Sequence, residues 1–552
     1  MKTKLATAIA AVLGALVLTG CNDSDKSSEE ASVCTGAEAS TERLFLQQIT
    51  DSSVIIKWRG DATAACIGTD ANGLGNLVEA TLTEGDHKEA KFDGLDADTT
   101  YYYSVGGAST APAGQMFKTA PASGYPADDN NTRIWLVGDS GTAGYTHEDA
   151  DASVPSETHY PGVAAGVRDG MHTFADASGE PIDLFLMLGD NAYNNGDDVN
   201  YQAAVFDTYP DELKRVGVWP TIGNHEMGVG FLDISKYYGE PDGTIVGYYG
   251  GVSTESDPDK YIVDGVAGTA GTYQTVPYLD IFSLPTAGEA GGVASATEQY
   301  YSFDYGNVHI VSLDSQLSGR DSTERATMKS WLESDLAAAS TESDWIVVIY
   351  HHPAYSKGSN HDSDSDASTV QTIDAPQVDM RNDFVPVFQK YGVDLVLNGH
   401  AHSYERSYYL TNLFSADPVN DPTAGDSDSF VMADNSYGPG LVNEFDETDG
   451  YVVYSTAGNG GKADSGPSGL DDSTEWLNHN AMVPQQFAGS IAAQVSSGTT
   501  SSFGVAGTST TGEHTDGLAL AGSVLIDASA SRLEWRMLNE DGQVLDKFVI
   551  NK

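Results

Sequence analysis

The chain has 552 residues, 40% of them hydrophobic, which is enough for a full hydrophobic core and for more than one domain. Its 80 acidic residues against 27 basic ones give a formal net charge of −53 at pH 7. A charge of this sign and size repels nucleic acid and anionic membranes, so nucleic acid is excluded as a structural partner.

The first twenty residues are typical of an export signal. Lys2 and Lys4 precede an apolar run, residues 5–18, that is too short to span a bilayer comfortably and ends in small residues. The following Leu-Thr-Gly-Cys at residues 18–21 resembles the bacterial lipobox. That resemblance implies a signal peptide at residues 1–20 and a lipidated Cys21 followed by a flexible tether, together residues 21–40. We therefore expect an exported protein, lipid-anchored to the bacterial cell envelope at the outer membrane, facing the periplasm or the surface.

Two cysteines remain after Cys21 is set aside. They are Cys34 and Cys66, and an even pair in an exported chain predicts a disulfide. Closing a loop of that length stabilises the folded state by roughly 3–4 kcal/mol in the chain-entropy model.

Residues 41–121 are predicted to form a small all-β sandwich. Short alternating runs at residues 44–49, 54–58, 78–83, 91–95, 100–105 and 115–118 are separated by turn residues at the spacing expected of that fold. Trp58 and the tyrosines at 101–103 resemble the core tryptophan and the tyrosine corner of fibronectin type III-like domains. Nothing in this segment looks catalytic, and residues 122–132 have the composition of a linker.

Residues 133–552 are predicted to form a layered α/β domain. Apolar residues at helical spacing predict helices within residues 161–177, 328–336 and 384–391, each placed between apolar strands. His309 lies inside an apolar run and is predicted to be a core histidine. The runs at 519–526, 533–538 and 544–550 alternate as edge or second-sheet strands do, so the domain is expected to reach the C-terminus.

Five apolar strands of this domain end in side chains that bind metals. The strands lie at residues 134–137, 184–188, 216–222, 345–350 and 394–398, and ligands gather beyond the carboxyl ends of strands in such sheets. The segments that follow them offer seven donors, too many for one ion: Asp139, Asp190, Tyr193, Asn224, His351, His400 and His402.

Mixed oxygen and nitrogen donors, with a carboxylate able to bridge, suit two metals about 3.5–4 Å apart, the arrangement that hydrolyses phosphate esters. One ion would orient the ester oxygen, and the other would lower the pKa of a bound water enough to give hydroxide near neutral pH. The lack of cysteine in the set favours hard, octahedral ions over a thiolate zinc site.

The strand-end motifs together resemble the signature of purple acid phosphatases within the calcineurin-like metallophosphoesterases. They read D-x-G at residues 139–141, G-D-x-x-Y at 189–193, G-N-H-E at 223–226, V-x-x-H at 348–351 and G-H-x-H at 399–402. The resemblance runs from residue 133 to the C-terminus, and the preceding sandwich matches the plant-type long form of the family. It implies a four-layer metallophosphoesterase-type β-sandwich flanked by helices.

The resemblance also assigns the donors to two ions. A ferric ion is implied for Asp139, Asp190, Tyr193 and His402. A divalent zinc, iron or manganese ion is implied for Asp190, Asn224, His351 and His400, with Asp190 as the bridge.

Two further histidines, His225 and His361, are implied to contact the phosphate. We expect His361 to act as the general acid that assists the leaving alkoxide, because its acidic neighbours favour the protonated form. His361 departs from the family pattern by opening an acidic run, and His352 competes for its role.

The sequence therefore predicts an exported, acid phosphatase-like enzyme that hydrolyses phosphate monoesters by attack of metal-bound hydroxide. One alternative is a phosphodiesterase or nucleotidase on the same site, since substrate range depends on the pocket walls and on the long insertion at residues 227–296. Another is a non-catalytic surface binding protein. A scaffold of that kind normally loses ligands, whereas this chain has a candidate at every position. The oligomeric state is left open.

Overall fold

The computed structural model describes residues 33–127, 129–144, 162–193, 196–227, 261–263, 272–274, 277–319, 321–356, 361, 363, 374–411, 431–432, 443–463, 481–482, 485–486, 513–514 and 520–552. The expected signal peptide, Cys21 and most of the insertion at 227–296 lie outside these residues. Among the described helices, none combines the length and the apolar character needed to cross a membrane.

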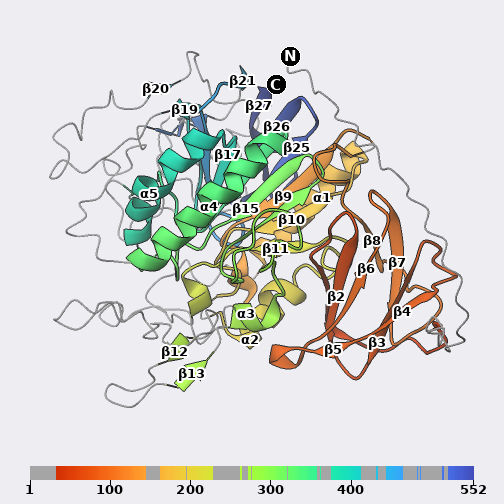
Figure 1. Cartoon of the computed structure of the whole chain (residues 1–552). Coiled ribbons are helices and arrows are strands. Elements are labelled where there is room, and N and C mark those ends of the chain that lie inside the picture. Colours follow the sequence, from red (N-terminus) through yellow and green to blue (C-terminus); the bar gives the residue numbers. More distant parts are fainter. Residues whose placement is uncertain are drawn as a thin grey trace, which may run out of the picture.

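Two four-stranded antiparallel sheets form the N-terminal part of the chain, drawn in red and orange in Figure 1. Their strand orders are β1-β2-β6-β5 and β4-β3-β7-β8. The strands are β1 (Glu42–Gln47), β2 (Ser53–Arg59), β3 (Ala64–Gly68), β4 (Asn76–Glu79), β5 (Thr81–Leu82), β6 (Lys88–Asp93), β7 (Thr100–Val105) and β8 (Met116–Lys118), with a 3-10 turn η1 (Glu84–Asp86). The predicted all-β sandwich is confirmed.

The sequence did not predict β3, the strand between β4 and β7. Its residues Ala64 to Ile67 are all buried, so the run has no polar alternation to mark it as a strand. The predicted disulfide is present: Cys66 on β3 is bonded to Cys34. Trp58 is buried in the core of the sandwich, and the Tyr101 hydroxyl accepts a hydrogen bond from the Asp96 backbone N–H at 2.9 Å, as in a tyrosine corner.

Two larger mixed sheets carry the α/β part of the chain. Their orders are β11-β10-β9-β25-β26-β27-β21 and β14-β15-β16-β17-β22-β18. The first contains β9 (Thr132–Val137), β10 (Leu184–Met187), β11 (Val218–Pro220), β21 (Asn443–Asp446), β25 (Gly522–Ala528), β26 (Arg532–Asn539) and β27 (Val544–Asn551). The second contains β14 (Tyr301–Tyr305), β15 (Val308–Ser312), β16 (Trp345–Ile349), β17 (Leu395–Asn398), β18 (Tyr404–Arg406) and β22 (Val453–Ala457).

Helices cover the outer faces of these sheets. The helix α1 packs against β25 and β26, while α4 and α5 lie side by side over the second sheet (Figure 1). The helices are α1 (Val163–Ser178), α2 (Asp198–Tyr201), α3 (Pro277–Ile281), α4 (Ser322–Glu342) and α5 (Ala375–Tyr391). The predictions at 328–336 and 384–391 were too short, because the exposed ends of α4 and the polar start of α5 lack apolar periodicity.

Two-stranded ribbons and single helical turns lie outside the larger sheets and helices. Three two-stranded ribbons pair β12 (Tyr261–Val263) with β13 (Thr272–Gln274), β19 (Leu410–Thr411) with β20 (Val431–Met432), and β23 (Gln485–Gln486) with β24 (Glu513–His514). Single turns of helix are η2 (Gly141–Gly144), η4 (Gln202–Phe206) and η5 (His225–Met227).

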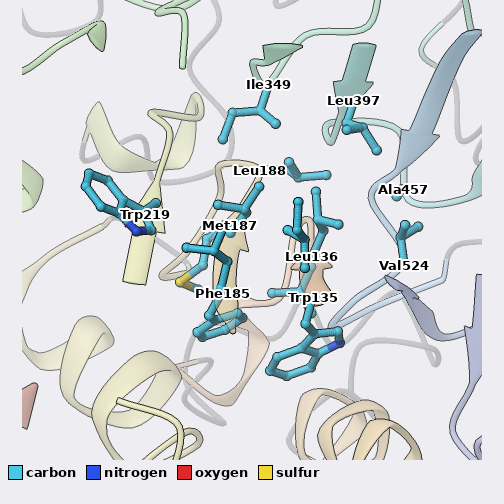
Figure 2. Packing of buried hydrophobic residues seen from close by; sticks show 14 of the residues in the cluster. Trp135, Leu136, Phe185, Met187, Leu188, Trp219, Ile349, Leu397, Ala457 and Val524 are labelled. Atoms are coloured by element: carbon cyan, nitrogen blue, oxygen red, sulfur yellow. The ribbon is translucent and has the colours of Figure 1, made fainter. Parts of the chain in front are cut away.

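The two large sheets pack face to face. Along β16, Val347 and Ile349 point into the core between the sheets, whereas Ile346 and Val348 point into the core beneath α4 and α5. Figure 2 shows side chains of both sheets meeting in the first of these cores, where Ile349 and Leu397 lie across from strands of the other sheet. The expected sandwich of two sheets flanked by helices is confirmed.

The C-terminal strands lie elsewhere than predicted. They are neither edge nor second-sheet strands: β25 pairs with β9 on one side and with β26 on the other, so they continue the sheet that contains β9 and β10. Of the three, β26 has the clearest alternation of buried and partly exposed residues, whereas β25 is buried at every residue except Asp527. Through the pairing of β25 with β9, residues 522–551 belong to the same sheet as β9 and β10.

Candidate metal centre

The five strands that precede the predicted ligands end at one place between the two sheets; they are β9, β10, β11, β16 and β17. The strands β9, β10 and β11 run parallel in the first sheet, and β15, β16, β17 and β22 run parallel in the second, so their carboxyl ends gather at common edges. Glycines let these edges approach. A Cβ on Gly399 would lie 2.5 Å from Asp139 Oδ2, and one on Gly189, which has a φ of 89°, would lie 2.6 Å from His351 Nδ1.

Three of the predicted ligands have left-handed backbone. The φ angles are 53° at Asp139, 51° at Asp190 and 70° at His400. Non-glycine residues rarely adopt such angles, and the strain of about 1–3 kcal/mol each concentrates at functional sites, where surrounding contacts hold it. The sharp turn after each strand points the side chain into the centre.

The first donor group surrounds Tyr193. Its hydroxyl lies 2.9 Å from Asp139 Oδ1, 3.0 Å from Asp190 Oδ2 and 3.4 Å from His402 Nε2. These are the four side chains predicted for the ferric ion. A phenol and two carboxylates are hard oxygen donors, so the set fits a hard cation.

The second donor group surrounds Asn224. Its Oδ1 lies 3.0 Å from both His351 Nε2 and His400 Nδ1, and Asp190 Oδ1 is 3.4 Å from His351 Nε2. The opposite nitrogens have acceptors of their own: His351 Nδ1 donates to Leu188 O at 2.9 Å and His400 Nε2 donates to Asp374 Oδ1 at 2.8 Å. The nitrogens facing Asn224 can therefore offer lone pairs. These converging acceptors fit a metal ion.

The carboxylates draw positive charge into the centre. Burial by itself would lower the pKa of His351, but the negative charges of Asp190 and Asp139 outweigh it and raise that pKa to about 9. Burial would raise the pKa of Asp190, but the neighbouring His351 and His225 hold it well below its usual range. A bound metal ion would supply positive charge at the same place and would take the place of the proton on His351 Nε2.

The histidines implied to contact phosphate lie beside the two groups. The ring of His225 packs edge-on against Tyr193 with centroids 4.3 Å apart, and its backbone N–H donates to Asp190 Oδ1 at 2.8 Å. The ring of His361 lies 3.9 Å from that of His400, with 15% of its side chain exposed. His352 is fully buried and its Nδ1 lies 2.8 Å from Ser315 Oγ. This placement favours His361 over His352 as the residue that faces a substrate.

Three further side chains of the centre received no role from the sequence. Glu226 accepts backbone hydrogen bonds from Gly223, Asp190 and Asn191 at 2.6, 2.9 and 2.7 Å, so it ties the strand ends of β10 and β11 together. Its burial, reinforced by the charge of Asp190, raises its pKa to about 7. Glu226 is the last residue of the G-N-H-E motif, and this position could have indicated from the sequence that it belongs to the centre.

The other two are Lys462 and Asp374. Lys462 is 3% exposed and its Nζ lies 4.3 Å from the centre of the Tyr193 ring, which places a cation beside the first donor group. The signal for Lys462 in the sequence was that one of the few basic residues of the chain follows a glycine-rich turn after an apolar strand. Asp374 precedes Ala375 and Pro376 in a helix-start pattern that does not point to a metal site, so it had no distinguishing signal. His309 is buried between Asp304 and Asp335, outside the centre, as predicted.

Comparison with known proteins agrees with this geometry. Residues 132–404 match the calcineurin-like phosphoesterase family. An acid phosphatase of Aspergillus ficuum is 25% identical over 400 residues, covering 58% of this chain and 60% of that protein. Purple acid phosphatase 23 of Arabidopsis thaliana is 25% identical over 393 residues, covering 69% of each.

A purple acid phosphatase from yellow lupin (Lupinus luteus) seeds has a similar structure. The TM-score is 0.55 at 17% identity, covering 94% of this chain and 75% of that one, and this likeness establishes the fold. The chain spans only 60 to 61% of the length of the first curated relatives that it matches.

Proposed function

We propose that the chain is a calcineurin-like metallophosphoesterase related to purple acid phosphatases and that it hydrolyses phosphate monoesters at a centre of two metal ions; the support from comparison is the family match over residues 132–404 and the similarity to acid phosphatases. The observation that carries this proposal is the convergence of all seven predicted donors into two groups that share Asp190.

Each donor group has a proposed ion. The group around Tyr193 binds a ferric ion, because a phenolate with two carboxylates suits a hard trivalent cation, and the group around Asn224 binds divalent zinc, iron or manganese. Asp190 would be shared by both ions, since its two carboxylate oxygens face different groups: Oδ2 approaches Tyr193 and Oδ1 approaches His351. When bound, the ions supply Lewis-acid activation of the ester and of the attacking water.

The chain's own histidines position the substrate. His225 is braced by Tyr193 and by the hydrogen bond from its backbone to Asp190, so its ring is held at the centre to contact a phosphoryl oxygen. His361, partly exposed above His400, donates a proton to the leaving oxygen. An alkoxide is a poor leaving group, so this protonation matters most for alkyl phosphates.

We place the enzyme outside the cytoplasm, anchored to the cell envelope through lipid on Cys21. The support is the lipobox-like sequence at residues 18–21 together with the Cys34–Cys66 disulfide, since disulfides persist in oxidising compartments.

The proposed activity is tested with para-nitrophenyl phosphate and its bis ester, each assayed on purified protein before and after chelation. We expect faster hydrolysis of the monoester, loss of activity with chelator, and recovery when iron and zinc are returned. Preference for the bis ester would assign a phosphodiesterase instead. A fully metallated protein that cleaves neither ester would be a non-catalytic binding protein.

A further inference from the structure

One carboxylate joins two histidines at the metal centre. Asp374 Oδ1 lies 2.7 Å from His361 Nδ1 and 2.8 Å from His400 Nε2. A carboxylate oxygen accepts hydrogen bonds, so both ring nitrogens are donors. The buried Gln377 adds a third donor through Nε2 at 3.2 Å. Within the described part of the chain, these contacts connect a predicted metal ligand to the predicted proton donor.

The carboxylate of Asp374 accepts no backbone hydrogen bond from the first turn of the helix it precedes. Asp374 is the N-cap residue of α5, where an aspartate ordinarily accepts a hydrogen bond from the first turn, yet its side chain makes no capping bond. The side chain turns to the two histidines instead. Helix capping therefore does not explain why an acidic residue stands at this position.

We propose that Asp374 is a positioning residue that holds His400 and His361 as one hydrogen-bonded unit over the metal centre. This inference rests on the proposed function. Accepting from His400 Nε2 leaves Nδ1, which faces Asn224 Oδ1, as the nitrogen that offers its lone pair to the divalent ion. Accepting from His361 Nδ1 leaves Nε2, which makes no hydrogen bond to any described residue, to face the substrate.

Two measurable effects follow from this arrangement. In an Asp374→Asn variant, the NH₂ group of the amide cannot accept a hydrogen bond. The remaining neutral oxygen accepts hydrogen bonds from the two imidazole rings less strongly than a carboxylate does. Loss of such a support to a ligating histidine typically costs about 10–100-fold in metal affinity or activity. We expect a loss of that size in affinity for the divalent ion, with the iron at the Tyr193 group retained.

The second effect concerns the leaving group. With the divalent ion saturating, kcat for an alkyl phosphate should fall more than kcat for para-nitrophenyl phosphate, while KM changes little, because only the alkoxide needs the oriented His361. The double variant Asp374→Asn/His361→Ala should have the same alkyl-to-aryl ratio of kcat as His361→Ala alone, since the residue that Asp374 positions is already gone. Asp374→Glu, which keeps the carboxylate, should restore part of the loss.

The control is Asp383→Asn on the same helix, where the carboxylate pairs with Arg325 and is 40% exposed. It should retain wild-type metal affinity and the wild-type alkyl-to-aryl ratio. An Asp374→Asn protein that matches this control in both measurements would overturn the inference and leave the proposed phosphatase intact. A wild type that is fully metallated and hydrolyses neither ester would instead refute the proposed function.

Discussion

The ion pair between Arg406 and Asp546 connects the two large sheets next to the metal centre. Arg406 lies on β18, which begins two residues after His402, and Asp546 lies on β27. The guanidinium donates to the carboxylate through Nε at 2.5 Å and Nη2 at 3.0 Å, and both side chains are 0% exposed. The Tyr404 hydroxyl donates to the same carboxylate at 2.7 Å.

We predict that Asp546→Asn destabilises the protein by about 3–5 kcal/mol, because the buried guanidinium of Arg406 loses the negative charge of this carboxylate. The amide keeps the shape of the side chain, so the loss reports the missing charge together with the acceptor oxygen that the NH₂ group replaces. Burial would raise the pKa of Asp546, but Arg406 outweighs it and lowers that pKa. The stabilisation is therefore present above the unfolded-state pKa of about 3.9 and is lost as the pH falls through the lower folded-state value.

Urea unfolding followed by tryptophan fluorescence measures the loss. The matched control is Asp93→Asn, where the carboxylate is 68% exposed and pairs with Lys91. An exposed pair contributes about 0–1 kcal/mol, so the control should stay within that range of wild type. If Asp546→Asn and the control lose similar free energy, the buried pair does not hold the sheets together and the reasoning is refuted.

Other predictions test the ligands, the core and the anchor. Tyr193→Phe should remove a visible phenolate-to-iron absorption band and loosen the iron without unfolding the protein; a metallated, active but colourless wild type would exclude the ferric assignment. Asp190→Asn should lose both metals by elemental analysis, since its oxygens face both donor groups. Burial lowers the pKa of His309, but its hydrogen bonds to Asp304 and Asp335 outweigh this and raise it to about 9. Its stabilisation is full below the unfolded pKa of about 6.5 and lost as pH rises through about 9, so His309→Gln should flatten the unfolding free energy across that window. Cys21→Ala should release the protein from membrane to soluble fractions; retention there would contradict the lipid anchor.

The convergence of the candidate ligands could be expected from the sequence because each follows a recognisable local pattern. A buried strand is a run of apolar residues, and a polar residue directly after it must lie at the end of a strand. Asp139 and Asp190 follow neighbouring parallel strands of one sheet, which end at one edge, and His400 follows a parallel strand of the other sheet. The sandwich was predictable because most of its strands are short apolar or alternating runs separated by turn residues at the spacing of that fold.

Only the tertiary structure showed which strands pair and which distant residues come into contact, because local sequence patterns do not encode these contacts. The strand β3 is buried on both faces, so its alternation is lost, and the place of β25 beside β9 depends on pairing between residues almost 400 positions apart. Asp374 reaches His400 only because α5 packs on the second sheet, and Lys462 reaches Tyr193 through a turn after β22. Such contacts arise from packing between distant segments, and the residues that make them are chemically ordinary until the fold brings them to the metal centre.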